Sequence, residues 1–273
     1  MPILTDTSVA SDWVEPDDVA RLVVTYGIAS KKIGKIELDM HRHAKGQILL
    51  VQHGALSCEV EDGLWIVPPR SAVWIPGGAL HAITATGSLE GYSAFVAADA
   101  DARLPRTCCT VSVTPLLREL LFRAASLPLF YDEGGANSRL VAVLLDEIAA
   151  AEVENLHLPM PTDARLRGLL NLMMSAPSER GTLDGWAKLA GLSKRTLARL
   201  ISRETGMSFA RWRQQLGVVL AVQRLAGGAS IQQVAADLGY ESVPSFVTMF
   251  RKTLGASPGR YMAERHSSRH RGC

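Results

Sequence analysis

The C-terminal half of the chain contains the same pattern of helix, glycine turn and helix twice, over residues 183–204 and 231–254. In each copy, alanines near the centre of an apolar helix let a second helix approach closely, and a glycine tolerates the positive φ that ends the first helix abruptly. A serine then stands where it can accept the free N–H groups of the second helix. These positions are Gly191 and Ser193 in the first copy and Gly239 and Ser242 in the second. Two copies, joined by a long helical stretch at 208–226, predict tandem helix-turn-helix motifs.

The second helix of the first copy has an apolar face and a basic face. Leu197, Leu200 and Ile201 recur at helical spacing and predict the buried side. The opposite side carries Lys194, Arg195, Ala198, Arg199, Ser202 and Arg203. Four cations in so short a stretch suit a groove lined by phosphates. A solvated basic face on a helical bundle is the alternative. It would account for a single helix-turn-helix pattern more easily than for two tandem copies of the pattern.

Charge divides the chain in the same place. Residues 1–160 hold 12 Lys and Arg against 20 Asp and Glu, a balance of −8, whereas residues 161–273 hold 17 against 7, a balance of +10. An acidic first half and a basic second half indicate different roles, and the basic half is the candidate for binding an anionic polymer. A chance partition of surface charge is the alternative, and the size of the difference makes it the weaker one.

Residues 189–262 resemble the C-terminal domain of the AraC/XylS-type transcription regulators. The stretch from Gly239 to Met262 carries the most specific part of the resemblance and reads G-Y-x-S-x-x-x-F-x-x-x-F-R-x-x-x-G-x-S-P-x-x-Y-M. The resemblance implies that the second helix of each motif enters one of two successive major grooves, with the intervening helix fixing their spacing near one DNA turn. By position, it implies base contacts from Arg195, Ala198 and Arg199 in the first motif and from Val243, Pro244, Ser245 and Thr248 in the second.

The two reading helices differ in chemistry. Arg195 and Arg199 can each bind guanine O6 and N7 in bidentate fashion, which discriminates between bases by about 1–3 kcal/mol per contact. The second helix offers mainly Val, Pro and Thr carbons, with Arg251 and Lys252 for phosphate contacts. We therefore expect the first motif to carry most of the hydrogen-bonded readout. The remaining predicted DNA contacts are Ser193, Lys194, Ser202, Arg203 and Ser242.

The first half has the texture of β-structure. Between about residues 33 and 98, short runs rich in Val, Ile, Trp and Tyr alternate with turns such as EDG, PPR and GGAL. Strands at this spacing predict a sandwich or a small barrel, and residues 99–112 form a connector.

Two short motifs in this half resemble those of the cupin barrel, H-x-H-x3-Q-x6-G and P-x-G-x-x-H. Their residues are His41, His43, Gln47 and Gly54 in the first and Pro76, Gly78 and His81 in the second. The resemblance implies a cupin-like sensing barrel over residues 1–112. His41 and His43 are expected on one face of a strand, Gln47 on the next strand and His81 on a third.

Three imidazoles and one amide that converge inside a barrel suit a divalent metal ion: zinc, nickel, iron or manganese. A glutamine in place of the glutamate usual in such barrels removes a negative charge and favours the softer, later metals. A barrel that binds an organic effector instead, in a cavity bordered by Trp74, is the alternative. Packed and hydrogen-bonded core histidines are a second alternative.

Two helices are predicted between the halves, within residues 113–160. Apolar side chains recur at spacings of three and four in PLLRELLFRAASL and in SRLVAVLLDEIAAAEVENL, and the PMP triplet at 159–161 predicts an interdomain linker. An apolar face that neither core covers would form a homodimer seam, and packing of both helices on the barrel is the alternative. From 161 to 264 the pattern predicts seven helices, before a basic tail at 265–273.

The sequence predicts neither a membrane span nor a secretory signal. No apolar run approaches the roughly 20 residues that cross a bilayer, and the N-terminus lacks a basic and apolar leader. The four cysteines have no C-x-x-C spacing and are expected to be reduced thiols in a cytoplasmic protein. Cys108 and Cys109 are expected to be inert, because neighbouring cysteines seldom form disulfides.

Together these features predict a two-domain protein, β then all-α, that acts as a one-component, sequence-specific transcription regulator and not as an enzyme. The expected partners are double-stranded promoter DNA, RNA polymerase, a small-molecule or metal effector and a second copy of the chain, and the family mostly activates. A cupin-type metalloenzyme, such as a dioxygenase or isomerase, fused to a DNA-binding tail is the alternative, although no acid–base pair is visible beyond the metal ligands. A non-specific architectural DNA binder is the third hypothesis, and it would need no sensing barrel.

Overall fold

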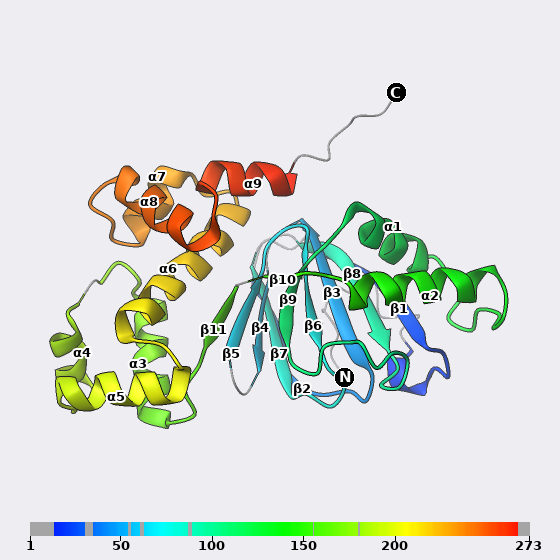
Figure 1. Cartoon of the computed structure of the whole chain (residues 1–273), viewed down its shortest axis with the longest axis horizontal. Helices are drawn as coiled ribbons and strands as arrows, with labels where there is room; N and C mark the ends of the chain where they lie inside the picture. The colour runs from blue at the N-terminus through cyan, green and yellow to red at the C-terminus, as the bar shows by residue number, and fades with distance from the viewer. Residues whose placement is uncertain are drawn as a thin grey trace. The chain divides into compact units, whose positions relative to one another are not determined.

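A computed structural model describes residues 14–30, 35–53, 56–60, 63–86, 89–154, 156–179 and 181–266. The chain forms two compact units (Figure 1). The N-terminal unit comprises the described residues of Met1–Val60 and Trp65–Asn155, and the C-terminal unit comprises those of Glu61–Leu64 and Leu156–Cys273. The division falls a few residues before the PMP triplet in which the sequence predicts a linker.

The N-terminal unit is built on two antiparallel sheets, preceded by a 3-10 turn at Pro16–Asp18. One sheet has the order β1-β8-β3-β6-β9-β10, and the other contains β5-β4-β7-β2. The strands are β1 (Val23–Ser30), β2 (Lys35–His41), β3 (Gly46–His53), β4 (Leu56–Val60), β5 (Gly63–Val67), β6 (Ser71–Ile75), β7 (His81–Thr86), β8 (Leu89–Val96), β9 (Cys109–Ser112) and β10 (Val153–Glu154).

Side chains of β3 alternate between two cores. Leu49 and Val51 pack between the sheets against residues of β4 and β7. Ile48 and Leu50 point to the other side, into a core completed by two helices. Because β3 is covered on both faces, it reads as a continuous apolar run rather than as an alternating one.

The helices α1 (Pro115–Ala124) and α2 (Ala136–Ala149) cover the outer face of the first sheet (Figure 1). Leu117 and Leu121 of α1 and Leu144 and Ile148 of α2 are buried there. The two predicted helices therefore exist and pack on the sheet, as the alternative interpretation held. The second is shorter than its sequence pattern suggests, because residues 153–154 form strand β10 beside β9.

The seven β-like runs of the sequence correspond to β2 through β8. The described strands form two sheets that are not closed into one barrel, so the cupin-like barrel is not confirmed. Two strands were not predicted from the sequence: β1, which pairs along its whole length with β8, and β9, which lies in the predicted connector.

The C-terminal unit is helical apart from the short strand β11 (His157–Pro159). Seven helices are described, close to the predicted ranges. They are α3 (Ala164–Ser175), α4 (Leu183–Leu189), α5 (Lys194–Thr205), α6 (Phe209–Ala226), α7 (Ile231–Asp237), α8 (Val243–Leu254) and α9 (Pro258–His266). Of the predicted basic tail, residues 267–273 lie outside the described residues.

Two helix pairs, α4–α5 and α7–α8, flank the long helix α6. Each pair turns at a glycine in the left-handed region, Gly191 with φ +66° and Gly239 with φ +70°. The serines predicted as caps do cap the second helices, since Ser193 Oγ accepts from Thr196 N at 3.1 Å and Ser242 Oγ from Ser245 N at 3.4 Å. Each cap is worth about 1 kcal/mol.

Each pair has its own buried centre. In the first, Trp186 and Ala187 of α4 pack near Leu197 and Ile201 of α5. In the second, the rings of Phe246 and Phe250 of α8 pack edge to face, and Tyr261 of α9 packs on Phe250 in the same way. Trp212 of α6 is fully buried, and its indole N–H donates to Pro159 O of β11 at 2.8 Å.

None of the helices in the described part of the chain is long and apolar enough to cross a membrane.

Candidate nucleic-acid interface and metal centre

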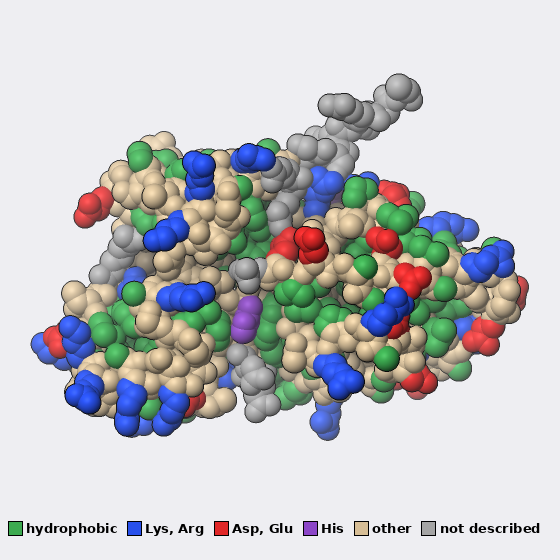
Figure 2. Space-filling view, viewed as in Figure 1, with side chains coloured by type: hydrophobic (Ala, Val, Ile, Leu, Met, Phe, Trp, Pro, Cys, Tyr) green, Lys and Arg blue, Asp and Glu red, His purple; other side chains and the backbone are tan. Residues whose placement is uncertain are grey.

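The predicted DNA-contacting residues of the first pair lie on the open face of α5. Lys194, Arg195, Arg199, Ser202 and Arg203 are exposed, and Ala198 among them is half-buried. The apolar face of α5 is turned inward as predicted. Figure 2 shows the Lys and Arg side chains that gather over this part of the unit.

The cations of α5 differ in their availability. Arg203 donates to Glu204 Oε1 at 2.7 Å, so part of its charge is already neutralised. Among the described residues, Arg195 and Arg199 enter no ion pair. They stand one helical turn apart on the exposed face, free to extend toward a ligand.

The second pair presents a less charged face. Ser242, Pro244, Ser245 and Thr248 are exposed and Val243 is half-buried. Arg251 and Lys252 are exposed in the last turn of α8. The chemical difference between the two reading helices that the sequence predicts is therefore preserved at the surface, with guanidinium groups on α5 and hydroxyl and aliphatic groups on α8.

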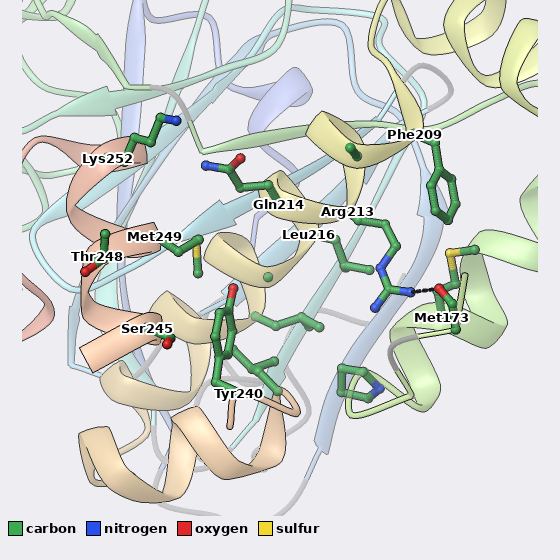
Figure 3. A pocket seen from close by; sticks show the side chains of 16 residues that line it. Met173, Phe209, Arg213, Gln214, Leu216, Tyr240, Ser245, Thr248, Met249 and Lys252 are labelled. Atoms are coloured by element: carbon green, nitrogen blue, oxygen red, sulfur yellow. Dashed lines mark hydrogen bonds between the residues drawn. The ribbon is translucent and has the colours of Figure 1, made fainter. Parts of the chain in front are cut away.

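A hollow of about 550 Å³ lies along α6, between α3 with its following loop and α8 (Figure 3). Its walls come from α3, α6, α8 and the turn of the second pair, and Ser245, Thr248 and Lys252 of α8 border it. No aspartate or glutamate lies among the residues described as lining it. The sequence analysis did not foresee this hollow, because helical periodicity reveals the faces of single helices and not the gaps between them.

Three histidines of the N-terminal unit form a compact cluster. One ring nitrogen of each of His41, His43 and His81 lies within 4.8 Å of the others. His41 ends β2 and His81 begins β7, where the two residues are paired across the strands. His43 follows the end of β2 and lies in the loop, so the expectation that it shares a strand face with His41 is wrong.

The proton positions on these rings follow from their partners. Each Nδ1 atom stands at hydrogen-bond distance from a backbone carbonyl, which can only accept. The carbonyls are those of Asp39 for His41, Lys45 for His43 and Ala79 for His81. Each Nδ1 therefore carries a proton, and in the neutral ring each Nε2 keeps its lone pair, as in histidines that bind metals.

Gln47, in the second position of β3, completes the cluster. Its amide nitrogen donates to Ser93 Oγ at 2.8 Å, which turns Oε1 toward His43 Nε2 at 3.1 Å. His43 Nε2 donates to Gln47 Oε1 when it carries a proton, and the two atoms present lone pairs to each other when it does not. A cation beside both would satisfy them, so the predicted set of three imidazoles and one amide oxygen fits a metal ion. Ser93 is a partner that no sequence motif identified.

His81 is fully buried, and its Nε2 has no hydrogen-bond partner among the described residues. Burial lowers the pKa of His81 to about 4, so the ring is neutral at pH 7 and ready to bind a metal. The loop that carries His43 is held from outside the sheets. The Asp17 carboxylate accepts from the N–H groups of Ala44 and Lys45, at 2.6 and 3.0 Å.

The remaining candidates of this unit lie elsewhere. Trp74 is buried on the helix-covered face of the first sheet, and it borders a separate hollow of about 330 Å³. Gly54 of the cupin-like motif lies outside the described residues. Cys108 packs between the sheets and Cys109 on the opposite face, and burial raises the pKa of Cys109 to about 11. These neighbours point apart, and Cys108 shares a hydrogen bond with Cys58, so the inertness of the two thiols stays a prediction.

Residues 186–264 match a family model described as a helix-turn-helix domain. The HTH-type transcriptional regulator NimR of Escherichia coli (strain K12) is 44% identical over 251 residues, which cover 91% of this chain and 90% of that protein. The HTH-type transcriptional regulator RipA of Corynebacterium glutamicum is 33% identical over 103 residues, which cover 38% of this chain and 31% of that protein.

Solved structures give weaker similarities. ToxT from Vibrio cholerae O395 aligns over 90% of this chain and 99% of its own, at 11% identity and a TM-score of 0.39. The DNA-binding domain of AdpA, solved in complex with a target DNA, aligns over 38% of this chain and 96% of its own, at 28% identity and a TM-score of 0.35.

Proposed function

The chain belongs to the AraC-type helix-turn-helix transcription regulators, and from this premise we propose that α5 and α8 read two successive major grooves of one operator. The chain is a regulator rather than a metalloenzyme, because a relative similar over nine-tenths of its length is a transcription regulator. The observation that carries the proposal is the exposure of the contact residues on both capped helices.

The two helices contribute differently to recognition. Arg195 and Arg199 read guanines, and Thr248 with its aliphatic neighbours packs against thymine methyl groups. Arg251 and Lys252 bind phosphates, which adds affinity without sequence information. The test is a binding titration of the full chain on an operator selected from random DNA. A complex that survives an excess of unrelated DNA supports sequence-specific binding. A complex that unrelated DNA displaces as readily as the operator itself supports the non-specific architectural alternative.

We further propose that the N-terminal unit is the sensor and that His41, His43, His81 and Gln47 hold one zinc, nickel, iron or manganese ion. Support comes from the lone pairs that converge at the cluster and from the orphaned Nε2 of His81. The bound metal would supply a fixed positive charge that joins β2, β3 and β7. An organic effector in the N-terminal unit is the remaining alternative, and Trp74 borders the hollow that would receive it.

The outer face of α1 and α2 is proposed as a homodimer seam. Leu116 and Val143 are 51% and 43% exposed, and Leu120 and Leu140 beside them are half-buried. Thr114 Oγ1 donates to Glu147 Oε2 at 2.9 Å and aligns the start of α1 with the end of α2. Leu116 and Leu120 lie one turn apart on α1, as Leu140 and Val143 do on α2, and we propose that a second copy covers them with the same residues.

Replacing Leu116 and Val143 by aspartate is expected to give a monomer, because two charges would be buried at the seam without partners. Sedimentation velocity of the purified chain measures the change. Val153→Asp, at another exposed valine of the same unit, is the matched control and should leave the dimer intact. A wild-type monomer at micromolar concentration, or a variant that still dimerises, contradicts the seam.

The family membership supports further proposals for the cell. We propose that the protein acts in the cytoplasm, contacts RNA polymerase and activates transcription. In vitro transcription from a promoter that carries the selected operator gives the sign of the effect, and lower transcript levels on addition of the chain would contradict activation.

A further inference from the structure

Apolar packing anchors the long helix α6, and polar contacts beside the hollow join it to both helix pairs. The hollow is bordered by α3, the α3–α4 loop, α6, the turn of the second pair and α8. Two neighbouring residues of α6, Arg213 and Gln214, reach from this helix toward opposite pairs. In Figure 3, Arg213 extends toward the side of Met173, whereas Gln214 extends toward the side of Met249 and Lys252.

Arg213 ties α6 to the first pair. Its guanidinium donates to Glu179 O at 3.2 Å and to Gly181 O at 3.5 Å, both in the loop that leads into α4. The same group lies 5.8 Å from the centre of the Trp186 ring on α4. A planar guanidinium held by carbonyls and a ring has little freedom to rotate, so it fixes α6 relative to α4.

Gln214 ties α6 to the second pair. Its amide nitrogen donates to Thr253 Oγ1 at 2.8 Å, near the end of α8. Thr253 Oγ1 in turn donates to Met249 O, one turn earlier on the same helix. The Thr253 hydroxyl is therefore oriented by its own helix. Its hydrogen bond with Gln214 restrains both the position of α8 along its axis and the rotation of α8 about that axis.

The turn of the second pair meets the same loop directly. A Cβ atom at Gly239 would stand 2.5 Å from Ser178 O, so the turn and the loop are in backbone contact. The α3–α4 loop therefore touches the second pair through Ser178 and α6 through Glu179 and Gly181. These contacts converge on one loop and on two consecutive residues of one helix.

From this convergence we infer that Arg213 and Gln214 are positioning residues that set the distance and rotation between α5 and α8, and thereby the base-pair spacing of the operator. The inference rests on the proposed reading of DNA by both helices. Inserting one base pair between the half-sites moves the second by about 3.4 Å and rotates it by about 35°. A rigid pair of reading helices cannot follow this change, whereas a loosened pair can.

The test compares an operator selected by the wild-type chain with the same operator carrying one inserted base pair between its half-sites. Wild type is expected to lose at least about 10-fold in affinity on insertion, since misplacing one helix removes its base contacts. Gln214→Leu and Thr253→Val are each expected to reduce this penalty to about 3-fold, because both remove the same hydrogen bond. For that reason the double variant should behave like either single variant.

Gln223→Leu, the same substitution later on α6 and outside the hollow, is the matched control and should keep the wild-type penalty. Thermal melting of each variant shows whether the fold is intact, and Thr253→Val, the smaller change, remains informative if Gln214→Leu unfolds. If the folded Gln214→Leu and Thr253→Val variants lose as much affinity on insertion of the base pair as the wild type does, the inference is overturned. A wild-type chain that is indifferent to the insertion contradicts the proposed two-helix reading itself.

Discussion

Replacing Arg195 and Arg199 together by alanine is expected to weaken specific binding to the selected operator strongly. Each guanidinium that binds a guanine in bidentate fashion contributes about 1–3 kcal/mol of discrimination, so the pair amounts to a loss of at least about 30-fold in specific affinity. Both side chains are exposed on α5 and lie opposite its buried leucines, so the fold should not change. Fluorescence anisotropy on the operator and on unrelated DNA measures the two affinities.

Two controls accompany this variant. Arg165→Ala removes an exposed arginine of α3 that pairs with Asp163, and it should leave specificity unchanged. Thr248→Ala removes a methyl and a hydroxyl group from α8, and we expect a smaller effect than from either arginine. Equal losses of sequence preference from Arg199→Ala and Thr248→Ala would contradict the asymmetry between the two reading helices.

Alanine in place of His81 is expected to remove a metal ion from the N-terminal unit. The imidazole is fully buried and neutral at pH 7, and its Nε2 is one of three ring nitrogens that converge. Losing one of three nitrogen ligands should lower metal content from about one equivalent per chain to a trace. Metal analysis of the purified chain gives the stoichiometry, and melting with added zinc or nickel gives the stabilisation, about 2.7 kcal/mol at 100 times the dissociation constant.

His53→Ala is the matched control for this measurement, because His53 is an exposed histidine paired with Glu90 outside the cluster. Equal metal content in wild type and His81→Ala would contradict the metal centre. Wild-type protein that contains no metal, and whose melting temperature does not shift on addition of zinc or nickel, would also contradict the metal centre. An organic effector would then be the remaining candidate ligand of the N-terminal unit.

The helices of the DNA-binding unit could be predicted closely from sequence, for a local reason. Serine caps, positive-φ glycines and apolar stripes are all encoded within a few residues of the helix they define. The N-terminal unit shows the limit of local signals. Strand β1 lies where the sequence carries few turn signals. Its conformation depends on pairing with β8, whose partner residues lie 59 to 73 positions further along the chain.

The end of α2 shows the same limit. The alanines at 149–151 favour a helix, yet the helix stops at Ala149. The next residues are engaged by β9, since Ser112 N donates to Glu152 O and Val153 pairs with Val111. A long-range pairing overrides local propensity here.

The residues of the candidate metal site were foreseen, and their geometry was not. The cupin-like motifs located His41, His43, Gln47 and His81, but not that His43 lies in a loop. That loop is positioned by Asp17, which is remote in sequence. Similarly, the helical pattern did not indicate that Gln214 binds Thr253. Periodicity shows which face of one helix is buried, and this contact joins side chains of two helices, α6 and α8.

Hydroxyl-radical footprinting of the full chain on its selected operator tests most directly whether both helix pairs read DNA. Two protected patches on one face of the duplex, separated by about one helical turn of 10 base pairs, are the expected result. The patch assigned to α5 should fade in the Arg195→Ala, Arg199→Ala variant while the rest of the chain stays folded. A single patch, or protection that is the same on scrambled DNA, would contradict the account.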